Sequence, residues 1–86
     1  MKNFNDIRSE LKDENPSLFF TLEIMGKMMA IRTKKGISQR ELSKLSGVPQ
    51  KTISRLENGL DYPRLDTLGK LAYALGMKII LVEDNG

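Results

Sequence analysis

Two short amphipathic segments on either side of Gly47 limit the possible folds of this 86-residue chain more than any other feature. Ser38 and Glu41 have the spacing of a capping box, in which each side chain accepts a hydrogen bond from the other residue's backbone amide. A helix is therefore predicted to start at Ser38 and to end at Gly47, because glycine takes the left-handed conformation at little cost. A second helix is predicted to start near Pro49.

The second segment has a polar face and an apolar face. Val48, Ile53 and Leu56 point toward a core. The opposite face carries polar groups and no carboxylate, from Gln50, Lys51, Ser54, Arg55 and Asn58. Such groups suit the base edges and phosphates of a DNA groove, although a solvated face on a packed helix is the alternative. Two short helices around a glycine turn form the helix-turn-helix plan, in which the second helix enters the major groove.

Three motifs closely resemble the phage-repressor-like helix-turn-helix family, of the XRE or Cro/C1 type. They are residues 37–42 (Ile-Ser-Gln-Arg-Glu-Leu), residues 47–48 (Gly-Val) and residues 52–59 (Thr-Ile-Ser-Arg-Leu-Glu-Asn-Gly). The resemblance extends over residues 24–76, and residues 63–76 are similar to that family's next helix. Many positions match at fixed spacing, which makes the resemblance more specific than a short motif.

The resemblance implies roles for individual side chains. Gln39 would contact a phosphate and brace Gln50, several positions of the second helix would read bases, and others would lie near phosphates. The implied DNA-binding residues are Gln39, Gln50, Lys51, Thr52, Ser54, Arg55 and Asn58. Arg32 and Glu57 match a structural ion pair of the family. Pro49 departs from the family, which often has a capping Ser or Thr there, so a cap or phosphate contact from that side chain is lost.

Apolar residues at helical spacing predict two more helices around this motif. One runs over residues 17–35, with Ser17 as its cap and Gly36 just past its end. The other follows Pro63 and stops at Gly76. Together with the two central segments and a short N-terminal helix within residues 1–16, they predict an all-α, five-helix phage-repressor-like fold, whose helix-turn-helix DNA-binding domain covers residues 17–76.

The N-terminal extension, residues 1–16, has a sparse apolar series that ends before Pro16. A short amphipathic helix that docks a partner is one interpretation, and a frayed tail is the other. Apolar surface at the start of the next helix adds to this series. The residues assigned to partner binding are Phe4, Ile7, Leu11, Phe19 and Phe20.

The C-terminal segment, residues 77–86, starts with the apolar run Met-Lys-Ile-Ile-Leu-Val and is predicted to form the chain's β-strand. A strand cannot satisfy its own backbone groups, so we expect antiparallel pairing with the same strand of a second subunit. A tail packed on the core is the alternative. The residues assigned to dimerisation are Met77, Ile79, Ile80, Leu81 and Val82.

Charge is unevenly distributed along the chain. Residues 24–64 hold nine basic and three acidic residues, a net charge of +6, whereas residues 1–23 carry −2 and residues 65–86 carry −1. The basic excess coincides with the helix-turn-helix and favours a polyanionic partner, which we expect to be double-stranded DNA with a palindromic operator.

The absence of Cys and His excludes Ser-His-Asp and Cys-His catalytic sites and thiolate metal sites. The carboxylates are scattered, so we expect no metal, no cofactor and no enzymatic activity. No apolar run approaches membrane-spanning length and no signal-peptide core is present, so we expect a cytoplasmic protein without a membrane partner.

The flanks of the chain also resemble HigA-type antitoxins, which pair with a HigB-type ribonuclease toxin and repress their own operon. An acidic stretch at residues 11–14, a long first helix and the sequence of residues 76–83 carry this resemblance. It implies that residues 1–23 lie against a basic toxin. The hypotheses from the sequence are a repressor that is also an antitoxin, a stand-alone regulator, and a protein-interaction module that has lost DNA binding.

Overall fold

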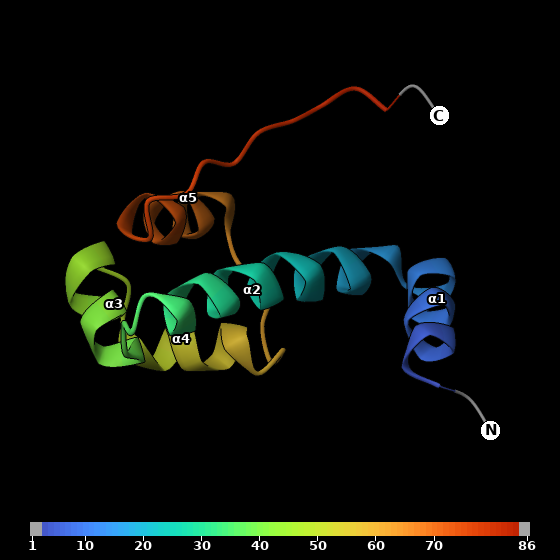
Figure 1. Cartoon of the computed structure of the whole chain (residues 1–86), viewed down its shortest axis with the longest axis horizontal. Helices are drawn as coiled ribbons and strands as arrows, with labels where there is room; N and C mark the ends of the chain where they lie inside the picture. Colours follow the sequence, from blue (N-terminus) through green and yellow to red (C-terminus); the bar gives the residue numbers. More distant parts are fainter. Residues whose placement is uncertain (1–2, 85–86) are drawn as a thin grey trace.

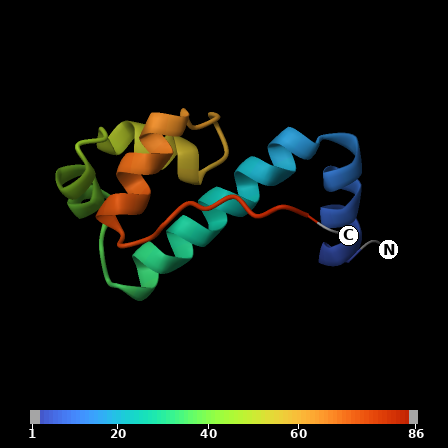
Figure 2. The ribbon, with the colours of Figure 1, turned by 90° about the horizontal axis from the view of Figure 1, so that it is seen from above.

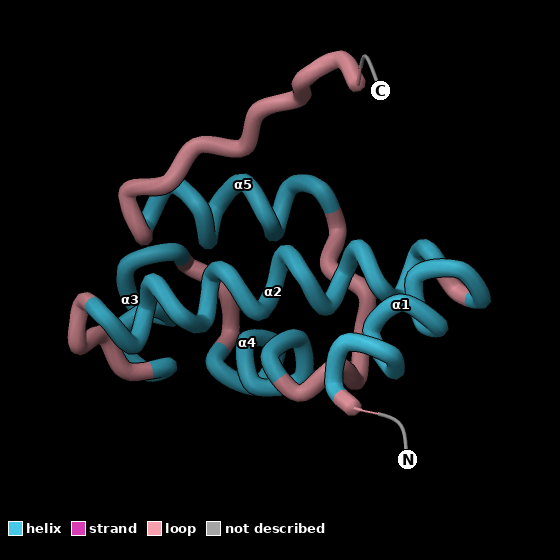
Figure 3. The backbone as a smooth tube through the Cα atoms, turned by 45° about the vertical axis from the view of Figure 1, so that its right-hand side comes forward, coloured by secondary structure: helices cyan, strands magenta, loops and turns pink. Residues whose placement is uncertain are grey.

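A computed structural model describes residues 3–84 of the chain, and this part contains five α-helices (Figure 1). In chain order they are α1 (Phe4–Glu14), α2 (Pro16–Lys34), α3 (Gln39–Ser46), α4 (Gln50–Glu57) and α5 (Leu65–Ala74). The long α2 crosses the middle of the molecule, α4 and α5 lie on opposite sides of it, and α1 lies at its N-terminal end (Figures 1 and 3). The predicted all-α, five-helix architecture is confirmed.

Asn15 and Pro16 build a corner between α1 and α2. The Asn15 amide donates to the Leu11 carbonyl at 2.8 Å, and the Asn15 side chain accepts from the Leu18 amide at 3.1 Å. One residue therefore ends α1 and caps α2, and Pro16 suits the first helical position because it needs no hydrogen bond there. Ser17, which we predicted as the cap, lies inside α2, and α1 stands across the end of that helix (Figures 1 and 2).

The predicted capping box fixes the start of α3. The Glu41 amide donates to Ser38 Oγ at 3.0 Å, and the Ser38 amide donates to Glu41 Oε1 at 3.3 Å. Gly47 ends α3 with a φ of 77°, in the left-handed region that we predicted. Pro49 occupies the N-cap of α4 without a side-chain hydrogen bond, as its chemistry requires.

The core lies where α2 meets the three helices that follow it. The three apolar residues that we predicted to face inward around α4 are all buried, and Ile53 is 0% exposed. Among the side chains that the structure describes, none of the core residues comes from α1, so the described part of this helix lies outside the packed body. The buried apolar residues are Met25, Met28, Leu42, Val48, Ile53, Leu56, Leu68, Leu71, Ala72 and Leu75.

The C-terminal segment is extended but forms no strand. Residues 77–84, here called the tail, leave the end of α5 and run back past α2 as an extended loop (Figures 2 and 3). No strand is present within residues 3–84, because no second extended segment lies beside the tail to pair with it. The predicted strand is therefore not supported in the single chain. Packing on the core is limited to the half-buried Met77, and Leu81 is 98% exposed.

Candidate nucleic-acid interface

The outer face of α4 presents the polar side chains that the sequence placed there. Gln50, Lys51, Arg55 and Asn58 are exposed, while Thr52 and Ser54 are half-buried at the edge of this face. Asn58 Nδ2 donates to the Ser54 carbonyl at 2.9 Å and lies 3.4 Å from Ser54 Oγ. The last turn of α4 is therefore braced by its own side chains, and the long donors nearer its start are free to reach outward.

A partly buried ion pair joins α2 to the end of α4. Arg32 Nε donates to Glu57 Oε2 at 2.7 Å, and Arg32 Nη2 donates to Glu57 Oε1 at 2.8 Å. Arg32 Nη1 also donates to the Ile37 carbonyl at 2.9 Å. The two side chains are 14% and 5% exposed, so the pair is shielded from water. This bidentate contact helps to fix the orientation of α4 relative to α2.

The hydrogen bond that Arg32 donates to the Glu57 carboxylate is the main reason that the pKa of Arg32 is raised, and burial opposes the shift. A raised pKa favours the charged form in the folded chain. The stabilisation from this shift is therefore present below the ordinary pKa of arginine and is lost only when the pH rises above it. The Arg32 guanidinium therefore stays charged across the neutral range.

Gln39 joins the same network. Its Nε2 atom donates to Glu57 Oε1 at 2.9 Å, so the side chain from the first turn of α3 points toward the Arg32–Glu57 pair. The resemblance had suggested a contact with Gln50 instead. In this chain Gln39 braces the end of α4, while its own position at the first turn of α3 stays at the edge of the surface.

Arg55 has a carboxylate partner that the sequence did not reveal. Arg55 Nε donates to Asp61 Oδ2 at 2.7 Å, and Arg55 Nη2 lies 3.5 Å from the Leu60 carbonyl. The two charged side chains are 45% and 56% exposed, so the pair lies at the surface. The sequence pattern placed Asp61 only among the scattered carboxylates. A signal was available, because the Asn58-Gly59 helix end turns the following residues back toward α4.

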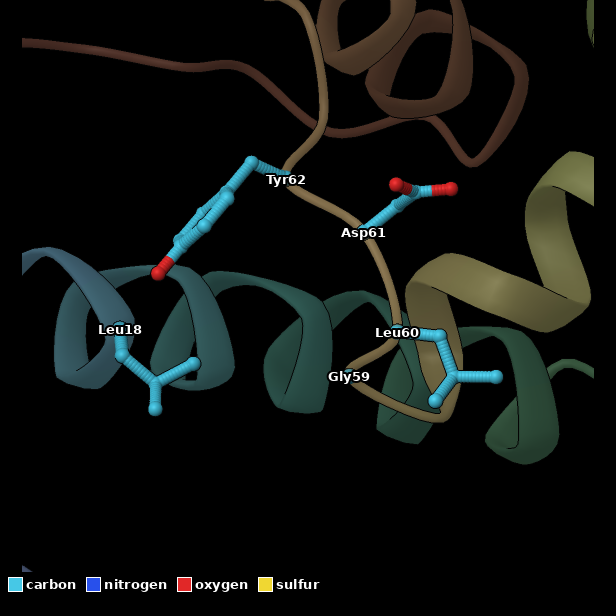
Figure 4. Close-up of a pocket in the computed structure, with 5 residues that line it drawn as sticks. All are labelled: Leu18, Gly59, Leu60, Asp61 and Tyr62. Atoms are coloured by element: carbon cyan, nitrogen blue, oxygen red, sulfur yellow. The ribbon is translucent and has the colours of Figure 1, made fainter.

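The loop after α4 follows a Schellman pattern. The Leu60 amide donates to the Arg55 carbonyl at 2.9 Å and the Gly59 amide donates to the Leu56 carbonyl at 3.2 Å, with Gly59 at a φ of 70°. Figure 4 shows that the Tyr62 ring leans over α2 while the Asp61 carboxylate points away from that helix. A hollow of about 120 Å³ here is lined by Leu18, Gly59, Leu60, Asp61 and Tyr62.

The residues assigned to partner binding do not form one surface. Ile7, Leu11 and Phe19 line a hollow of about 290 Å³ between α1 and α2, here called the N-terminal hollow. Arg8 and Lys12 lie over the Phe19 ring, with charge-to-centroid distances of 5.1 and 5.8 Å. Phe20 lies elsewhere, in a second hollow of about 290 Å³ between α2 and the tail. The side chain of Phe4 lies outside the described residues.

Comparison with known proteins identifies the family. Residues 28–81 match the family model described as Helix-turn-helix. The chain belongs to the XRE-type helix-turn-helix family. An uncharacterised HTH-type transcriptional regulator from Haemophilus influenzae is 34% identical over 82 residues, which are 93% of this chain and 84% of that protein. The family resemblance seen in the sequence is thus confirmed.

Other relatives in this helix-turn-helix family point to antitoxins. Antitoxin HipB from Escherichia coli is 30% identical over 66 residues, which are 77% of this chain and 75% of HipB. A solved toxin–antitoxin module from Streptococcus pneumoniae superimposes with a TM-score of 0.74 at 38% identity, covering 96% of this chain and 94% of that one. The chain therefore has both transcriptional regulators and antitoxin-related proteins among its relatives.

Two further features do not occur in the part of the chain that the structure describes, a membrane-spanning helix and a metal-binding cluster. Between residues 3 and 84, no helix combines the length and the apolar character needed to cross a membrane. The same residues contain no group of three or more His, Cys, Asp or Glu side chains arranged to hold a metal ion.

Proposed function

We propose that this helix-turn-helix protein is a sequence-specific transcriptional repressor that places α4 in the major groove. The observation that carries the proposal is the division of α4 into a fully buried apolar face and an exposed polar face. Ile53 and Leu56 hold the helix in the core, so Gln50, Lys51 and Arg55 project from a rigid support. Rigid presentation matters because base readout depends on side-chain geometry as well as on charge.

A dimer would present two copies of α4 to the same DNA duplex. The tail is extended and apolar, with Ile80 at 72% and Val82 at 80% exposure, and residues 78–83 make no backbone–backbone hydrogen bond within the described chain. Antiparallel pairing with the same tail of a second copy would satisfy these groups and bury those side chains. Met77, Ile79 and Leu81 would join the contact. A two-fold dimer would then read two half-sites about one helical turn apart.

A toxin is the protein partner in this proposal. The N-terminal hollow is mostly apolar and lies between α1 and the start of α2, outside the packed core, so a partner could cover it without disturbing the helix-turn-helix. The antitoxin relatives support this function, and the resemblance of the flanks to HigA-type antitoxins suggests a HigB-type ribonuclease toxin as the partner. The segment that would meet a basic toxin, residues 1–23, carries a net charge of −2.

The first test is binding of the whole chain to its own upstream DNA over a salt series, with and without the product of the adjacent gene. A repressor should bind one palindrome tightly and lose affinity steeply as salt rises, because released counterions drive part of the binding. Equal affinity for upstream and unrelated duplexes would contradict the repressor function. A Lys70→Ala variant is the matched control for variants in α4, because it removes one exposed positive charge from α5 and leaves the N-terminal hollow intact.

The adjacent gene product separates the antitoxin from a stand-alone regulator. A change in DNA affinity on adding that product, together with loss of its ribonuclease activity, is the result expected for an antitoxin. No complex with the product would leave a transcriptional regulator without a toxin partner.

Removal of residues 77–86 tests the proposed dimer. The shortened chain should sediment as a monomer and lose affinity for a palindrome far more than for a single half-site. A Leu81→Lys variant keeps the full length and should weaken the dimer by placing like charges at the two-fold contact. A dimer that survives the deletion would show that another surface joins the subunits.

A further inference from the structure

We propose that Asp61 is a specificity-determining positioning residue, which orients Arg55 so that the arginine reads one guanine. The inference rests on the proposed DNA binding by α4. It starts from the contact between Arg55 Nε and Asp61 Oδ2 at 2.7 Å.

The backbone after α4 fixes the position of Asp61. The Schellman hydrogen bonds tie the amides of Gly59 and Leu60 to the last turn of α4, so the loop cannot swing away without breaking them. Gly59 is also confined, since a Cβ atom there would lie 3.2 Å from Leu22 Cδ2 and its φ is 70°. Asp61 follows Leu60 directly, so the fixed backbone holds its carboxylate within hydrogen-bond distance of Arg55 in the DNA-free protein.

The contact uses one edge of the guanidinium and leaves the other open. Nε and Nη2 form the side edge, and these are the atoms that face Asp61 Oδ2 and the Leu60 carbonyl, at 2.7 and 3.5 Å. The end edge, formed by Nη1 and the second Nη2 hydrogen, keeps two parallel donors. Two parallel donors match the O6 and N7 acceptors of guanine in the major groove. Asp61 thus selects the edge of Arg55 that can make this bidentate contact.

The negative charge of Asp61 should weaken binding to unrelated DNA, although the same carboxylate favours binding where the guanine is present. A carboxylate beside the DNA-facing arginine repels phosphates and partly neutralises Arg55, which weakens binding driven by charge alone. Where a guanine is present, the same carboxylate lowers the entropy lost when Arg55 is ordered. Asp61 therefore raises the ratio of specific to non-specific affinity, and loss of the carboxylate should move the two affinities in opposite directions.

The experiment uses the full chain and a pool of duplexes randomised over two helical turns, followed by affinity measurements on the selected duplex and its single-base variants. Arg55→Ala should abolish the preference at one guanine position, a loss of about tenfold or more in discrimination. Asp61→Asn should reduce discrimination at that same position by about threefold to tenfold, while affinity for an unrelated duplex rises. Discrimination at the other positions should stay unchanged.

Asp66→Asn is the matched control. Asp66 pairs with Arg64 at 3.2 Å and is 57% exposed, close to the 56% of Asp61, so the variant removes the same charge from a similar environment. It should raise affinity for all duplexes alike and leave the guanine position unchanged. An Asp61→Asn variant with the discrimination of the unaltered chain, or with tighter binding to every duplex, would overturn the inference while leaving DNA binding by α4 in place. Failure of the unaltered chain to select any sequence would overturn both.

Discussion

Two arginine–carboxylate pairs involve residues of α4. They have the same hydrogen-bond distance and differ in how deeply they are buried. Arg32 Nε lies 2.7 Å from Glu57, and Arg55 Nε lies 2.7 Å from Asp61. The first pair is 14% and 5% exposed, whereas the second is 45% and 56% exposed. The same hydrogen-bond distance therefore occurs in a shielded structural contact and in a contact open to water.

Burial decides what each pair can do. When one partner of a buried pair is removed, the other charge is left without its counterion in a poorly solvated site, so the pair is expensive to break. A surface pair is worth little because water and salt solvate each charge almost as well. In the proposed complex with DNA, Arg55 could therefore leave or share its carboxylate, whereas Arg32 keeps its partner as part of the fold.

The largest expected effect is loss of stability on breaking the buried pair. Glu57→Gln keeps the shape of the side chain but leaves Arg32 charged and unpaired, which should lower the free energy of unfolding by about 3 kcal/mol. Urea denaturation followed by circular dichroism measures the change. Asp61→Asn, the same substitution chemistry at the exposed pair, should change stability by less than about 1 kcal/mol. Equal losses in the two variants would contradict the difference drawn between the pairs.

The next effect separates recognition from folding. Arg55→Ala should weaken binding to the preferred duplex by about 1–3 kcal/mol, because a bidentate base contact is lost. Its unfolding free energy should stay within about 1 kcal/mol of the unaltered chain, because only an exposed pair is broken. Fluorescence anisotropy with a labelled duplex and urea denaturation on the same preparation give both values. A variant that loses stability but keeps its DNA affinity would assign Arg55 to the fold.

Much of the helix-turn-helix could be predicted from the sequence because local chemistry specifies it. Ser38 and Glu41 cap α3 by a contact between near neighbours, and Gly47 ends that helix through its own backbone freedom. The burial of Ile53 and Leu56 follows from helical periodicity alone. Each of these features depends on residues a few positions apart, which is the range over which sequence patterns are informative.

Contacts that depend on the path of a loop or on the packing of several helices are harder to predict from the sequence, and so is a strand that needs a second chain. The contact of Asp61 with Arg55 spans the end of a helix and requires the geometry of the loop, which residue types alone did not disclose. Gln39 was expected near Gln50 but donates to Glu57, because three helices converge at that carboxylate. Residues 77–82 have the composition of a strand, yet a strand needs a neighbour, and none is present within residues 3–84.

A smaller effect tests how far Gln39 belongs to the buried pair. Gln39→Ala removes the hydrogen bond from Nε2 to Glu57 Oε1, so the free energy of unfolding should fall by about 1 kcal/mol. Affinity for unrelated DNA and its dependence on salt should change little if the side chain mainly braces the carboxylate. A uniform loss of affinity for all duplexes, with stability unchanged, would instead identify Gln39 as a phosphate contact.

The smallest expected effect is the coupling energy of the exposed pair in the free protein. A double-mutant cycle of Arg55→Ala and Asp61→Ala should give about 0.5 kcal/mol at low salt, and the value should vanish near 1 M salt because the charges are screened. The same cycle on Arg32 and Glu57 should keep most of its coupling, since salt penetrates a buried pair poorly. The free energies of unfolding of the unaltered chain, the single variants and the double variant, each measured at both salt concentrations, give the coupling energies. A salt-resistant coupling at the exposed pair would mean that Asp61 holds Arg55 for the fold, and its role in guanine readout would then have to be judged from the DNA affinities alone.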